Sequence, residues 1–189
     1  MKILRIAALA LFVAASLSAE RLALLDNGLR LLFIDSSAPS VTLATVTVTG
    51  MQAGETLAAI DYRPSNGVLY GIGALVASGP ARLYTINTTT GAATLVGSGP
   101  FHQTIGFFPI GMDFNPVVDR IRMISNGGHN LRVNPNDASV IEDARPAFAP
   151  GDPHSSNFTL SLAYSNNFAG ATSTTLYGIV SGNGPFLAT

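Results

Sequence analysis

Apolar and polar residues alternate in short runs along most of the chain after its first 20 residues. The runs "VLYGIG", "RLYTIN", "DRIRMI" and "NLRVN" are typical, and Gly, Asn, Thr and Pro separate such runs. Alternation with a period of two places apolar side chains on one face of a β-strand, and Gly and Asn favour turns. No later segment keeps a helical period, and the nearest to one, "AGETLAAI", is short. We therefore predict an all-β fold.

The strand-length runs recur with a period near 50 residues. "IDYRPSNGVLYGIG" (60–73) matches "MDFNPVVDRIRMIS" (112–125), so that Asp113 follows Asp61 by 52 positions. A third copy begins with "LAYSNNF" at residue 162 and continues with "LYGIV". The second half of the unit is found at residues 30–46, 82–97 and 130–143. Each complete unit thus contains four short strands.

A four-stranded unit with two apolar faces cannot bury both alone, whereas radial stacking of several units buries them. We therefore predict a β-propeller-like domain over residues 20–189, with repeated four-stranded antiparallel blades of about 50 residues and roughly three to four blades. A β-sandwich is the alternative. Three arrangements would account for the half-units. They pair with each other in one blade, the ring is incomplete, or copies of the chain associate. The predicted parts are an N-terminal half-unit (22–48), two units (58–98 and 108–143) and a C-terminal half-unit (160–187).

The first 19 residues have the three parts of a secretory signal peptide. A basic start, "MKILR", precedes an apolar run, "IAALALFVAASL", and a small-residue exit, "SLSA". The apolar run is too short for an ordinary membrane-spanning helix, so we predict no membrane span. Cleavage after Ser18 fits the small-residue rule better than cleavage after Ala19. We expect a secreted or periplasmic protein.

The composition of the mature chain excludes several kinds of partner and site. Removal of the signal peptide takes away the one lysine and one arginine, and leaves eight arginines against eleven acidic residues. A lysine-free surface with a net charge of −3 is unsuited to nucleic acid, so we expect no nucleic-acid partner. The chain has no cysteine, which excludes disulfides, thiolate zinc sites and cysteine nucleophiles.

Three long motif strings carry a resemblance to a known family. "LYGIG…RLYTINTTTGAATLVGSGPF", "GMDFNPVVDRIRMISNGGHNLRVNP" and "LAYSNNFAGATSTTLYGI" resemble the bacterial domain of unknown function 4394 over about residues 21–187. The resemblance implies an exported protein with a β-propeller-like fold, and it carries over no catalytic residue. Members of that family typically continue beyond the "LYGI" strand with a further half-unit and one more unit, so this chain is expected to be shortened at its C-terminus.

Asp61 and Asp113 each precede a proline, Pro64 or Pro116, by three positions. An aspartate accepts backbone N–H bonds at the head of a turn, and proline fixes φ within it. We favour this structural role for all four residues because the pattern recurs at the repeat spacing. The alternative is a ring of carboxylates that holds a cation such as Ca²⁺. Ala163 at the third equivalent position weakens that alternative.

The string "DRIRM" distinguishes the second unit from the first. Asp119 stands at the turn position of Gly67, and Arg120 and Arg122 alternate with apolar residues on one strand face. We favour a solvated or inter-blade ion-pair face with Asp119. The functional alternative is a basic patch, completed by Arg132, for a carboxylate or a sugar acid.

The longest segment outside the repeat runs from residue 142 to residue 158. Its Glu142, Asp143, Asp152 and His154 are the candidate contacts for a ligand or a metal, because insertions between blades often form binding loops. A plain surface loop is the favoured interpretation. The three histidines have no zinc-ligand spacing, so no metal site or cofactor is predicted, with Ca²⁺ as the one possibility.

No catalytic motif stands out, so we favour a non-enzymatic exported binding or scaffold module over an enzyme. Its partner is expected to be an extracellular or envelope ligand or protein. The alternative is a propeller-type hydrolase or lyase that uses a cation near the channel. We also expect self-association through an incomplete blade edge.

Overall fold

The computed structural model describes residues 19–27, 29–75, 79–101, 110–125, 127–153, 159–181 and 185–189. Within these residues the chain forms 14 strands and no helix, so the predicted all-β class is confirmed. No described segment is a helix with the length and hydropathy needed to cross a membrane.

The strands form four separate antiparallel sheets, each a meander in which neighbours along the chain pair. Sheet 1 contains β1 (Arg21–Asp26), β2 (Arg30–Asp35) and β3 (Ala38–Thr47). Sheet 2 contains β4 (Thr56–Tyr62), β5 (Leu69–Ala74), β6 (Arg82–Ile86) and β7 (Ala93–Leu95). Sheet 3 contains β8 (Ile110–Asn115), β9 (Arg120–Ser125), β10 (Asn130–Val133) and β11 (Val140–Asp143). Sheet 4 contains β12 (Thr159–Tyr164), β13 (Leu176–Val180) and β14 (Phe186–Ala188).

The sheets follow the predicted repeat. The two predicted units contain the four-stranded sheets 2 and 3, and the two half-units contain the three-stranded sheets 1 and 4. Among the described strands, those of sheet 1 do not contact those of sheet 4. The two half-units therefore do not pair in one blade.

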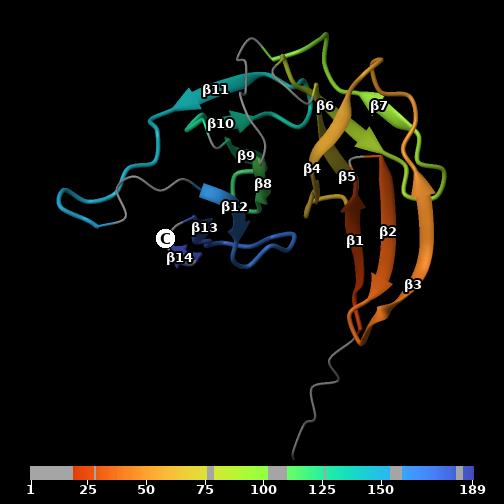
Figure 1. Ribbon diagram of the computed structural model, residues 1–189, viewed down its shortest axis with the longest axis horizontal. Helices are drawn as coiled ribbons and strands as arrows, with labels where there is room; N and C mark the ends of the chain where they lie inside the picture. The colour runs from red at the N-terminus through yellow and green to blue at the C-terminus, as the bar shows by residue number, and fades with distance from the viewer. Residues whose placement is uncertain are drawn as a thin grey trace, which may run out of the picture.

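The sheets succeed one another around an open arc (Figure 1). The first strands of consecutive sheets are neighbours, because β4 contacts β8 and β8 contacts β12, and β1 also contacts β4. The last strands β3, β7 and β11 lie on the outer side of the arc (Figure 1). The first strands therefore lie on the inner side of the arc, next to one another.

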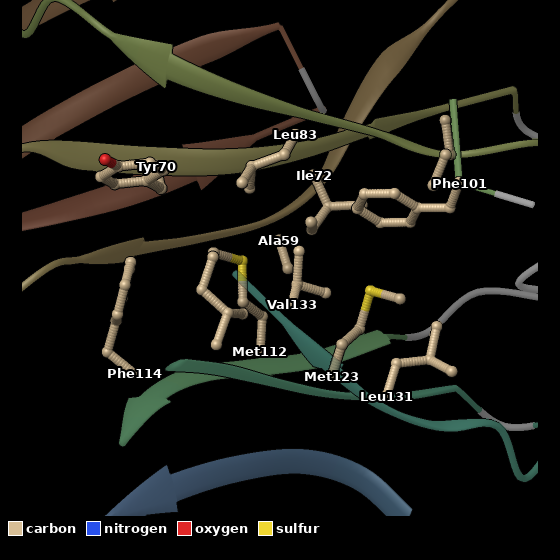
Figure 2. Close-up of a cluster of buried hydrophobic side chains, with 13 residues drawn as sticks. Ala59, Tyr70, Ile72, Leu83, Phe101, Met112, Phe114, Met123, Leu131 and Val133 are labelled. Carbon is tan, nitrogen blue, oxygen red and sulfur yellow. The ribbon is translucent and has the colours of Figure 1, made fainter. Parts of the chain in front are cut away.

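Two clusters of buried apolar side chains hold the first three sheets together. Phe114 and Met123 of sheet 3 pack against Tyr70, Ile72 and Leu83 of sheet 2 (Figure 2). The rings of Tyr70 and Phe114 meet edge to face, with centroids 5.3 Å apart. A second cluster joins sheets 1 and 2 and contains Leu31, Phe33, Val48, Leu57, Leu69 and Ile86. No comparable cluster of described residues lies between sheets 3 and 4.

Two glycines let the backbones of neighbouring sheets approach closely. Gly91 has a φ of +77°, and a Cβ there would lie 2.0 Å from the carbonyl oxygen of Thr47 at the end of sheet 1. Gly97 has a φ of +75°, and its Cβ would lie 2.2 Å from the carbonyl oxygen of Asp137 in sheet 3. Only glycine fits both the left-handed backbone and the close contact.

Candidate functional site

Asp61 and Asp113 lie on the first strands of sheets 2 and 3 and bind the next sheet rather than their own turns. Oδ2 of Asp61 accepts the backbone N–H of Phe114 at 2.7 Å, and Oδ2 of Asp113 accepts that of Tyr164 at 2.7 Å. Oδ1 of Asp61 also accepts the N–H of Tyr62 at 2.8 Å. Each carboxylate thus joins one first strand to the next, in the order β4, β8, β12. These partners differ from the predicted ones, which were backbone N–H groups of each aspartate's own turn.

Burial raises the pKa values of both carboxyl groups. It raises the pKa of Asp61 from its ordinary value of 3.8 to about 6. Burial and then the negative charge of Asp61 raise the pKa of Asp113 from 3.8 to about 7. A proton is therefore retained on this pair up to near-neutral pH.

Pro64 and Pro116 lie in the turns between the first two strands of sheets 2 and 3, as predicted. In the second turn, Oδ1 of Asn115 accepts the backbone N–H of Val117 at 3.0 Å. The side chain that caps this turn is therefore Asn115 and not Asp113.

Asp119 pairs with an arginine of the neighbouring sheet. Its φ of +51° matches the +68° of Gly67 at the equivalent turn position. Nε of Arg63 donates to Oδ1 of Asp119 at 2.8 Å, and a terminal guanidinium nitrogen binds Oδ2. This bidentate ion pair with Arg63 holds the pKa of Asp119 below its ordinary value. This ion pair joins sheets 2 and 3, and the partner of Asp119 is Arg63 rather than an arginine of its own strand.

Arg122 and Arg132 lie opposite each other on β9 and β10 and share Asp143. Arg122 donates to Oδ2 of Asp143 at 2.6 Å and to Oδ1 of Asn130 at 2.7 Å. Arg132 donates to Oδ1 of Asp143 at 2.8 Å. Hydrogen bonds from the two arginines lower the pKa of Asp143. Among the described residues, the buried Nε of Arg122 has no hydrogen-bond acceptor.

Arg120 and Glu142 lie outside this cluster. Arg120 donates to the carbonyl oxygen of Asp119 at 2.9 Å. Glu142 contacts Nδ1 of His129 at 2.8 Å. Arg120 of the predicted basic patch thus contacts the turn before β9, and Glu142 contacts the loop before β10.

Asp152 and His154 were the remaining candidates of the long segment. Asp152 lies on the strand-free stretch 144–153, and His154 lies outside the described residues. Within the described part of the chain, no three His, Cys, Asp or Glu side chains are grouped as metal ligands. The predicted ligand set is therefore not assembled from the described residues.

A cavity of about 670 Å³ lies between sheets 3 and 4, at the sheet contact that has no apolar cluster. Gly178 and Ala188 form part of its wall, and such small side chains leave the space open. The larger lining residues are Ile124, Phe148, Leu162, Leu176 and Val180, with the polar Ser125, Asn130 and Arg145. Sequence reasoning did not find this site, because its walls come from segments far apart in the chain.

The face of sheet 3 that meets sheet 4 differs from the equivalent face of sheet 2. Leu83 lies opposite Ile72 in sheet 2, whereas Asn130 lies opposite Ile124 in sheet 3. Likewise Tyr70 lies opposite Asp61, whereas Arg122 lies opposite Asp113. This exchange of apolar for polar residues is the sequence signal that could have indicated a site here.

Comparison with known proteins identifies a family. A search of curated proteins found no match. The family model for a domain of unknown function, DUF4394, matches residues 30–186, which is most of the chain and includes strands of all four sheets. The chain therefore belongs to the DUF4394 family.

Proposed function

We propose that this chain is a non-enzymatic exported binding module whose four sheets are blades of a β-propeller-like fold. The neighbouring first strands β4, β8 and β12 and the outer last strands support the propeller arrangement. The observation that carries the binding function is the cavity between sheets 3 and 4. It replaces the apolar cluster found at the two other sheet contacts.

Most acidic and basic residues that could have been catalytic are engaged elsewhere. Asp61, Asp113 and Asp119 each bind a group on a neighbouring sheet. Asp143 is held by Arg122 and Arg132. These side chains stabilise the arc, which supports a binding or scaffold role over catalysis.

A fragment screen followed by NMR tests the binding function. We expect fragments of roughly ten to fifteen heavy atoms to perturb signals of Ile124, Leu162 and Leu176, because the cavity volume is typical of a small-molecule site. Perturbations confined to other surfaces, or no binding from a broad library, would refute a ligand site in this cavity.

The alternative is a propeller-type hydrolase or lyase that uses a cation beside Asp61 and Asp113. The raised pKa values of this pair favour it, since perturbed carboxyl groups are frequent at active sites. Equilibrium dialysis against Ca²⁺ with metal analysis separates the proposals. Stoichiometric Ca²⁺ that is lost in a folded Asp113→Asn variant would support the cation site. Absence of bound Ca²⁺ would argue against it.

Export is tested by the N-terminus of the protein recovered from the periplasm or medium. We expect a mature chain that starts at Ala19 or Glu20, after cleavage at the small residues of "SLSA". A full-length chain retained in the cytoplasm would contradict this location.

A further inference from the structure

The cavity between sheets 3 and 4 has an apolar interior. Ile124 of β9 faces it from one sheet, and Leu162 and Val180 face it from the other. These three side chains are 5%, 8% and 3% exposed, so the walls they form are shielded from bulk water. An apolar group of a ligand would be stabilised there by its removal from water.

Ser125 adds an unsatisfied polar group to the same wall. Ser125 is 2% exposed, and its Oγ has no hydrogen-bond partner among the residues that the structure describes. A buried hydroxyl without a partner is destabilising, because it has lost its hydrogen bonds to water. A ligand atom that accepts or donates a hydrogen bond would remove this cost.

Arg145 supplies an unpaired positive charge. It lines the cavity and is also exposed, so it lies where the cavity opens to solvent. Among the described arginines, the other seven each bind a carboxylate, a carbonyl oxygen or an aromatic ring, whereas Arg145 has no such partner. A guanidinium group in this position favours a carboxylate, which it can bind through two parallel hydrogen bonds.

Asn130 connects the cavity to a group of paired charges. It lines the cavity and binds Arg122, which together with Arg132 binds the carboxylate of Asp143. These charges are engaged with one another, so Arg145 is the charged side chain of the lining that can bind a ligand.

We propose that this cavity binds a small amphipathic carboxylate, with its apolar part between Ile124 and Leu162 and its carboxylate at Arg145. This ligand class rests on the proposed binding function. The cavity of about 670 Å³ lies within the range of sites that enclose a small organic molecule.

A matched pair of probes tests the proposal. Binding of 6-phenylhexanoate and of the neutral 6-phenyl-1-hexanol is measured by NMR titration with the mature chain. We expect the carboxylate to bind roughly 3- to 10-fold more tightly, as an exposed charge-assisted pair allows. In Arg145→Gln the two probes should bind equally. Arg30→Gln on sheet 1 removes the same charge far from the cavity and should leave the preference intact.

A variant that fills the cavity gives a second test. Ala188→Phe places a ring among the lining residues and should weaken both probes at least 10-fold, while circular dichroism verifies the fold. Should Ala188→Phe fail to fold, Gly178→Val makes a smaller change at a position with room for a Cβ.

Several results would overturn the assignment. Equal affinity of the two probes for the unmodified chain would refute the carboxylate preference but leave a neutral-ligand module standing. A preference that persists in Arg145→Gln would refute the role of Arg145. Failure of both probes to bind, or shifts that map away from Ile124 and Leu162, would refute this ligand class, and fragments bound elsewhere in the cavity would still support the binding function.

Discussion

A carboxyl group buried between two sheets keeps its place only if its charge or its proton has a partner. Asp61 and Asp113 satisfy this condition by accepting backbone N–H groups of Phe114 and Tyr164 on the following sheets. Bonds of this kind favour the charged form, whereas burial and mutual repulsion favour the protonated form. Since burial is the largest effect, both pKa values are raised, to about 6 and about 7.

The raised values predict that stability falls as the pH rises. The unfolded chain releases these two protons near its ordinary pKa of 3.8, whereas the folded chain retains them up to about 6 and 7. Folding therefore takes up protons in this window, and the free energy of unfolding decreases from about pH 4 to about pH 7 and then levels off. Urea unfolding across this range should show a loss of several kcal/mol, because a shift of one pKa unit corresponds to about 1.4 kcal/mol.

Asp113→Asn is the matched variant, since the amide keeps an oxygen for the N–H of Tyr164 but cannot titrate. Its stability should depend much less on pH over the same range. An unmodified chain that gains stability between about pH 5 and about pH 8 would contradict the raised values.

The pair between Arg63 and Asp119 is also open to a direct test. The Arg63 side chain is 12% exposed and the Asp119 side chain 35%, so solvent screens their attraction only in part. A double-mutant cycle with Arg63→Gln and Asp119→Asn should give a coupling energy of roughly 1 kcal/mol. A coupling energy of no more than about 0.3 kcal/mol would show that the two side chains act independently.

At the scale of elements, close approach between sheets depends on residues outside the strands. Gly97 follows β7 and brings the chain against the turn that contains Asp137 in sheet 3. In the sequence Gly97 indicates only a turn after β7, and the contact across the sheets gives it a second function. Any side chain at this glycine would displace the neighbouring sheet.

Gly97→Ala is expected to destabilise the fold by roughly 2 kcal/mol or more, because the residue has a positive φ and its Cβ would meet the carbonyl oxygen of Asp137. Gly99→Ala is the control, since a Cβ at Gly99 meets nothing within 4 Å. Chemical unfolding of both variants checks the difference. Equal stabilities would show that sheets 2 and 3 do not approach each other as described.

The repeat predicted the strands and their grouping well, because alternation and turn residues are local properties. The partners of the polar residues could not be predicted in the same way. Asp61 binds Phe114, 53 positions away, and that contact depends on how two sheets stack. The cavity was missed for the same reason, since Gly178 faces Asn130 only after sheet 4 packs on sheet 3.

For the whole molecule, the two ends of the arc expose apolar sheet faces. Leu22 and Leu24 of sheet 1 point away from sheet 2 and are 39% and 45% exposed. At the other end, Ile179 and Leu187 of sheet 4 lie opposite each other and are 45% and 65% exposed. Faces of this kind are covered by the adjacent sheet elsewhere in the arc.

These faces predict self-association of the mature chain. Sedimentation velocity over a range of concentrations should show reversible oligomers, because burial of the two faces removes apolar surface from water. The double variant Leu24→Lys with Leu187→Lys should weaken association at least 10-fold. Val118→Lys changes an equally exposed apolar residue in a turn and is the control. A chain that stays monomeric at every concentration would contradict this prediction.

The central claim about the molecule is that the carboxylates of Asp61 and Asp113 join the neighbouring strands β4, β8 and β12. The amide signals of Phe114 and Tyr164, whose N–H groups these carboxylates accept, test it most directly. In an NMR titration the Phe114 amide should shift with a midpoint of about 6 and the Tyr164 amide with one of about 7. Asp61→Asn should abolish the first titration and lower the midpoint of the second, since the charge of Asp61 helps to raise the pKa of Asp113. Amides that do not respond to pH in this range, or that respond near 4 as free aspartates do, would contradict the account.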